Sequence, residues 1–136
     1  MKAAQNPASP FNPIVQVSWG EYIDKITILE IKEERLKSSE AVANVRRELT
    51  VLRAAPDIQS KYPSVAPLVR ELKVINEALW EIEDKIRVKE AVKSFDQEFV
   101  DLARSVYLHN DKRAALKRQI NMLTNSEIIE EKQYMA

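Results

Sequence analysis

The chain has no cysteine, one glycine and no excess of either charge sign, and each shortage narrows what the protein can be. Without cysteine there are no disulfides, no thiol nucleophile and no thiolate metal ligand. A single glycine, Gly20, argues against a sheet with tight turns. Basic and acidic residues number 21 each, so no overall field attracts nucleic acid or an anionic membrane, and we expect neither partner.

Long apolar runs are also missing. No uncharged stretch approaches the roughly 18 residues of a membrane span, and the opening MKAAQNPASPFNP has no continuous apolar run before its prolines. The sequence therefore predicts neither a signal peptide nor a membrane segment. A cytoplasmic location is expected by default.

What the chain does contain is typical of amphipathic helices, with 45% hydrophobic and 31% charged residues. A length of 136 residues suffices for one domain with its own hydrophobic core. Prolines in the opening segment predict an extended N-terminal arm over residues 1–17, where Val15 and Val17 would lay apolar side chains on the body. We expect an all-α fold with residues 18–136 as a single helical bundle domain.

Capping residues and prolines divide this domain into four or five helices. Ser18 and Glu21 form a capping-box pattern, and the Ser94/Gln97 pair has the same spacing. The expected helices run from Ser18 to about Lys37, from Ser38 to near Pro56, from Ser64 to the turn near residue 94, from there to Asn125, and briefly on toward Lys132. The first two could also form one bent helix.

The two long helices share a regular apolar seam. In the earlier one the seam repeats at spacings of four and three without a polar interruption, through Leu68, Leu72, Ile75, Leu79, Ile82 and Ile86. Two helices of nearly 30 residues, each about 40 Å long, would form an antiparallel hairpin, with the earlier helices alongside as a third layer. The predicted architecture is an elongated antiparallel helical hairpin or bundle.

The first helix suggests an assembly. Its apolar residues point nearly all the way round the axis: Tyr22, Ile23, Ile26, Ile28, Leu29 and Ile31. One neighbouring helix cannot cover such a surface, so we expect a homodimer. The alternative is that the N-terminal arm covers the remainder within the same chain.

The last long helix carries the most informative pattern. Its apolar stripe is Phe95, Phe99, Leu102, Val106, Leu116, Ile120 and Leu123, and His109 and Arg113 occupy the positions between. This spacing directs both polar residues toward a core or a cleft, where a polar group is costly unless it is partnered. His109 and Arg113 therefore mark the place where recognition or chemistry is expected.

Neighbouring helices offer partners of opposite charge. Glu33 falls on the main apolar side of the first helix, and Glu83 lies within reach of His109 across the hairpin. The candidate binding residues are Glu30, Glu33, Glu83, His109, Asn110, Arg113 and Lys117. Three interpretations stay open: an ion-pair network that fixes helix register, with Arg113 forked onto a carboxylate; a pocket for a small anionic ligand; or a solvated face.

An enzyme is the alternative. Glu30-x-x-Glu33 and Glu81-x-x-Asp84 resemble the paired acidic motifs of all-helical nucleotide pyrophosphohydrolases, which hold magnesium. That resemblance implies a magnesium-dependent hydrolase of a nucleotide or another phosphorylated metabolite, with Glu30, Glu33 and Glu83 as metal ligands and Arg113 or Lys117 on phosphate. Acidic pairs at this spacing recur elsewhere in the chain, so the leading expectation includes no metal cofactor and no catalysis.

Longer strings resemble an uncharacterised family of small bacterial proteins: IVQVSWGE, IDKITILEIK, LWEIEDKIR and NDKRAALKRQIN. The resemblance implies a bacterial cytoplasmic protein and brings no activity with it. The function expected from the sequence is a helical binding or assembly module.

Overall fold

The computed structural model describes residues 12–134, and within that range the protein consists of helices and loops without a β-strand. The predicted all-α class is confirmed. The elements are α1 (Trp19–Arg35), α2 (Ser39–Leu52), α3 (Ile58–Lys61), a 3-10 helix η2 (Pro63–Val65), α4 (Ala66–Ala91) and α5 (Gln97–Leu123). Of the predicted arm over residues 1–17, residues 1–11 lie outside the described residues.

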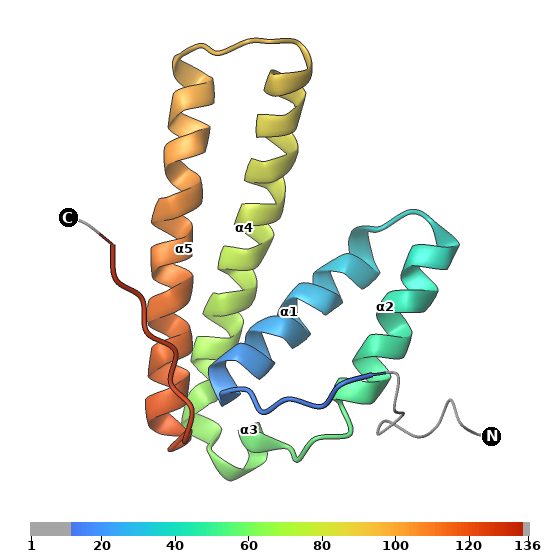
Figure 1. The fold of residues 1–136 in the computed structure, drawn as a ribbon, viewed down its shortest axis with the longest axis vertical. Helices are drawn as coiled ribbons and strands as arrows, with labels where there is room; N and C mark the ends of the chain where they lie inside the picture. Colours follow the sequence, from blue (N-terminus) through green and yellow to red (C-terminus); the bar gives the residue numbers. More distant parts are fainter. Residues whose placement is uncertain (1–11, 135–136) are drawn as a thin grey trace.

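Helices α4 and α5 form the predicted antiparallel hairpin and rise as the tallest part of the molecule (Figure 1). Their turn includes Lys93 at a φ of 58°. The N-cap of α5 is Asp96, whose side chain accepts a hydrogen bond from the Phe99 backbone N–H at 2.9 Å. The expected Ser94 cap is therefore wrong by two residues, because the left-handed turn residue moves the helix start forward.

Helices α1 and α2 form a second hairpin that leans away from the first, so that the ribbon opens into a V (Figure 1). Ser18 and Ser38 cap them as predicted, and each accepts a backbone N–H three residues on. Leu36 has extended backbone angles and separates the two helices, which excludes one bent helix. The first turns of α1 contact α5, and its later turns contact α4 through the Lys73–Glu30 and Arg35–Glu81 ion pairs. α2 packs on α1 instead, so the expected third layer made of both helices is absent.

The core lies where α1 crosses the base of the tall hairpin. Its buried members are Ile23, Ile58, Val65, Leu72, Leu116 and Ile120, and a smaller cluster between α1 and α2 consists of Leu29, Val45 and Leu49. Ile23, Leu29 and Ile31 of α1 are thus buried within a single chain. The apolar circumference of α1 does not require a second chain.

Both ends of the described chain differ from the sequence prediction. Val15 and Val17 are 73% and 49% exposed, so they do not pack on the body. Residues 124–134 form no helix; Asn125 adopts a φ of 53° and the segment turns back along α5 (Figure 1). The Ser126 N–H donates to the Asn121 carbonyl at 2.9 Å, which ends α5 as a Schellman-type turn.

Across residues 12–134, no helix combines the length and the apolar character that crossing a bilayer requires.

Candidate functional site

Polar side chains from α1, α4 and α5 meet at a buried carboxylate, that of Asp24 in α1, which is 1% exposed. It accepts hydrogen bonds from Arg113 of α5 through Nε at 2.9 Å and Nη2 at 2.5 Å. Asn76 of α4 donates to it at 2.9 Å and donates also to the Thr27 hydroxyl at 2.9 Å. Three helices are therefore joined at one carboxylate, and the bidentate guanidinium fixes their relative register.

The partners of Asp24 keep it ionised. Burial raises the pKa of the carboxyl, but the hydrogen bonds from Arg113 and Asn76 and the charges of Arg113 and Lys117 lower it by more. The net pKa of Asp24 lies below its ordinary value, and the bond to Asp24 raises that of Arg113. Both groups are charged at neutral pH.

The contact between α1 and α5 continues as a polar ladder. Arg113, Lys117 and Asn121 recur every fourth residue on α5 and so share one face. The Lys117 ammonium lies 2.6 Å from Glu21 and 3.7 Å from Asp24. Ion pairs and hydrogen bonds thus hold this interface together with the apolar cluster that includes Ile23, Leu116 and Ile120.

Gly20 permits the ladder to close. Its N–H donates to the Asn121 side-chain oxygen at 2.7 Å, and a Cβ at this position would lie 2.8 Å from the same oxygen and against the Lys117 carbonyl. The chain's single glycine is therefore required here for close approach of two helices rather than for a turn.

The C-terminal segment brings a second carboxylate to the end of the ladder. Glu130 accepts from the Ser18 hydroxyl at 2.8 Å and from Asn121 Nδ2 at 3.3 Å. Partial burial raises the pKa of Glu130, but these hydrogen bonds and the charge of Lys117 lower it by more. The segment is thereby fastened to the start of α1.

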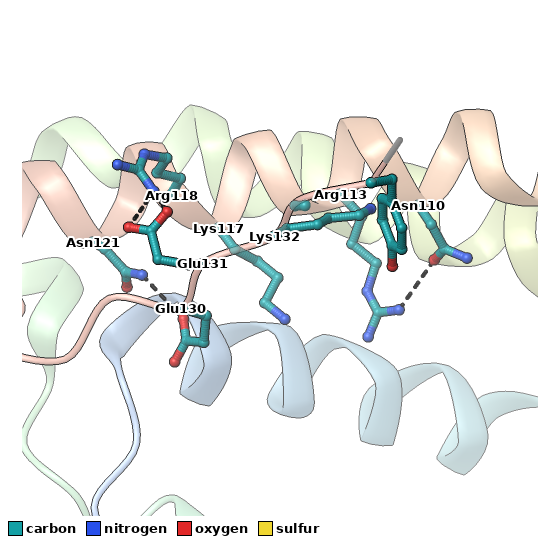
Figure 2. A pocket seen from close by; sticks show the side chains of 10 residues that line it. Asn110, Arg113, Lys117, Arg118, Asn121, Glu130, Glu131 and Lys132 are labelled. Atoms are coloured by element: carbon teal, nitrogen blue, oxygen red, sulfur yellow. Dashed lines mark hydrogen bonds and ion pairs between the residues drawn. The ribbon is translucent and has the colours of Figure 1, made fainter. Parts of the chain in front are cut away.

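A cleft of about 450 Å³ lies between α5 and this segment (Figure 2). Four cationic side chains and two carboxylates are among the residues that line it: Asn110, Arg113, Ala114, Lys117, Arg118, Asn121, Glu130, Glu131, Lys132 and Tyr134. Figure 2 shows Lys117 and Arg113 extending from α5 toward α1 beneath the segment. The cleft therefore combines a cationic floor with an acidic, peripheral cover.

The structure brings together three of the seven candidate residues. Arg113 forks onto a carboxylate, as the ion-pair interpretation expects, Asn110 accepts from its Nη1 at 3.3 Å, and Lys117 lies one turn along. His109 faces elsewhere: its Nδ1 lies 2.7 Å from the Ser105 carbonyl of its own helix, and its ring lines a shallow groove with Ile75 and Ala78. The imidazole does not join the charged network.

The three candidate glutamates are dispersed. Glu30 pairs with Arg53, Glu33 with Arg46, and Glu83 with Arg87. Within residues 12–134, no group of three acidic or histidine side chains is arranged to hold a metal ion. The geometry needed for the magnesium alternative, and the expected approach of Glu83 to His109, are therefore not found.

Asp24 was absent from the sequence candidates although it is the centre of the site. The apolar residues on every side of α1 hid the direction of its inner face. The available signal was the row Gly20, Asp24, Thr27 and Ile31, at spacings of four and three, all of which are buried. A small residue and a hydroxyl in line with an acid mark a close, polar helix contact.

The fold and the site define an all-α protein of two helical hairpins joined through a buried ion-pair network. The chain belongs to the family of unknown function DUF6165, which matches residues 14–136. No curated protein and no solved structure matches the chain.

Proposed function

We propose that the protein is a binding module whose cleft between α5 and the C-terminal segment receives the anionic group of a small ligand. The observation that carries this proposal is the carboxylate of Glu130, which accepts from Ser18 and Asn121 beside Lys117. Because the hydroxyl of Ser18, the amide of Asn121 and the charge of Lys117 already hold one carboxylate here, the same groups are suited to the carboxylate or phosphate of a ligand.

The cationic side chains of the cleft provide further donors for the anionic group of the ligand. Arg113 uses Nε, one Nη2 and one Nη1 donor within the protein, and its side chain is 28% exposed, so donors remain for a ligand. Arg118 and Lys132 stand at the rim, where each is paired with an exposed acid. Pairs at the surface contribute little, so an incoming anion exchanges with them at small cost.

The acidic side chains of the segment are competitors in this arrangement. Glu130 and Glu131 offset half of the charge of the four lining cations, so a bound anion competes with at least one of these carboxylates. We expect binding to open the C-terminal segment locally while the Asp24–Arg113 pair beneath stays intact.

The test is a titration of the full chain with inorganic phosphate and with succinate, followed by backbone amide NMR shifts. Shifts should gather at residues 110–121 and 126–134. Lys117→Gln should weaken binding about tenfold or more, whereas the matched change Lys112→Gln on the far side of α5 should leave it unchanged.

Glu130→Gln tests the exchange directly. It keeps the side chain's size and removes the competing charge, so the affinity for both probes should rise several-fold. An absence of saturable shifts in the wild type and in Glu130→Gln would overturn the proposal, as would shifts that Lys117→Gln leaves unchanged.

A further inference from the structure

One side of the tall hairpin loses its cover halfway along. α1 contacts α5 through Arg113, Lys117 and Asn121, and its last turn reaches α4 only as far as the Arg35–Glu81 ion pair, so the part nearer the turn is two helices thick (Figure 1). Helical spacing continues the same face of α5 toward the turn as Asn110, Val106, Ala103 and Phe99. We call this uncovered side the upper hairpin face.

Large apolar side chains gather on and beside the upper hairpin face. Phe95, Val100 and Tyr107 are each more than 40% exposed, and Phe95 stacks edge-on against Phe99. On α4 the same side carries Trp80, Glu83 and Arg87, which line a hollow of about 340 Å³ with Ile28 and Ile31. A two-helix ribbon with such a face requires a further layer to bury it.

Residues of similar kind, or of opposite charge, lie at equal distances on either side of one central position in each helix. On α5, Phe99 and Tyr107 lie four residues either side of Ala103, and Val100 and Val106 lie three either side. On α4, Glu83 and Arg87 lie two residues either side of position 85. Apolar residues therefore lie symmetrically about Ala103 on α5, and an acid and a base lie symmetrically about position 85 on α4.

The two centres lie at the same height. Ala91 ends α4 and Gln97 begins α5, and positions 85 and 103 are each six residues from those ends. In an antiparallel hairpin equal distances from the turn mean equal height. A two-fold axis across the hairpin at that height matches aromatic with aromatic, and acid with base.

We propose that a second copy of this chain covers the upper hairpin face, so that two hairpins pack as an antiparallel four-helix bundle. Ala103 then faces its equivalent, and Glu83 faces Arg87 of the second copy, as expected of an isologous interface. The turn of each hairpin, with Val92 and Phe95, reaches the level of the other's apolar hollow beside Ile28. This moves the dimer contact expected from α1 onto α4 and α5.

The overlap sets the strength of the dimer. Two helices about 10 Å wide that overlap over roughly 25 Å cover a footprint of about 500 Å² on each copy. About 1,000 Å² in total is at the lower end for a specific interface. We therefore expect a reversible dimer with a Kd in the micromolar range.

Sedimentation velocity of the full chain from about 1 to 200 µM tests the proposal. The wild type should shift from monomer to dimer across this range. Ala103→Glu places two acids on the axis and should raise the dimer Kd about tenfold or more. The matched change Val74→Glu, at an exposed position on the other side of α4, should leave the Kd unchanged.

A charge exchange distinguishes this interface from others. Glu83→Lys alone and Arg87→Glu alone should each weaken the dimer, and the double variant should restore it, with circular dichroism confirming that all four proteins are folded. A monomeric wild type at every concentration would overturn the proposal. A dimer weakened by Val74→Glu but unaffected by Ala103→Glu would do the same, because the contact would then lie on the opposite face.

Discussion

Replacing Arg113 with leucine tests the buried network most directly. The change leaves the Asp24 carboxylate, which is 1% exposed, without its bidentate partner. Removing one member of a buried ion pair costs about 3–5 kcal/mol. Asn76 and Lys117 remain beside Asp24, and the Arg113 side chain is 28% exposed, so water can enter. The lower end, about 3 kcal/mol of unfolding free energy, is therefore expected.

Urea denaturation measures this loss. With a slope of about 1.5 kcal/mol/M for a domain of this size, the midpoint should fall by about 2 M. Arg118→Leu is the matched control on the same helix, because Arg118 and its partner Glu131 are both at least half exposed, and it should lose less than about 1 kcal/mol. A loss of that small size for Arg113→Leu would refute the assignment of Asp24 as a buried charge that depends on Arg113.

Three further outcomes are expected. Gly20→Ala should lower Tm, corresponding to about 2 kcal/mol, despite alanine's higher helix propensity, because the new Cβ meets Lys117 and Asn121 across the α1/α5 contact; an unchanged or raised Tm would contradict that packing. Since the folded-state pKa of Asp24 is lowered, its contribution to stability is present above the unfolded-state pKa, near 4, and is lost as the pH falls through the folded-state value, so Asp24→Asn should flatten the acid limb of a stability–pH curve. Ser18→Ala removes the α1 cap and a partner of Glu130 and should cost about 1 kcal/mol in the same urea assay, with a Ser38→Ala control that affects α2 alone.

Local signals in the sequence were sufficient for most helix boundaries. Ser18 and Ser38 cap helices through bonds to residues three positions on, and such contacts depend on neighbouring residues only. At the hairpin turn two residues, Ser94 and Asp96, were suitable caps. Asp96 is the cap because the backbone turns at Lys93 with a positive φ. The residue preferences of the sequence do not indicate this conformation at a lysine.

The candidate site depended on information that a helix pattern does not contain. Arg113 was identified because it interrupts a clear apolar stripe. Asp24 was not, since α1 is apolar on every side and only the positions of α4 and α5 determine which side is buried. Glu33 was expected inward on the same helix and instead pairs with Arg46 of α2, a helix whose direction depends on the break at Leu36.

The C-terminal segment shows the same limit. Ser126 followed by acidic and apolar residues satisfied the rules for a short helix. The segment instead runs back along α5 without forming a helix, and its side chains form hydrogen bonds to Ser18, Asn121 and Asp111. Tertiary partners more than 100 residues away in sequence, such as Ser18 for Glu130, outweighed a weak local preference.

The 89 residues that separate Asp24 from Arg113 have a consequence for biosynthesis. At about 5–20 residues per second, a ribosome needs roughly 4 to 18 s after adding Asp24 before it adds Arg113. During that interval a nascent α1 holds an acid destined for the interior with no cation to neutralise it. The domain therefore has to wait for its last helix, and conditions that slow translation late in the message would prolong the exposure of an aggregation-prone, half-finished chain.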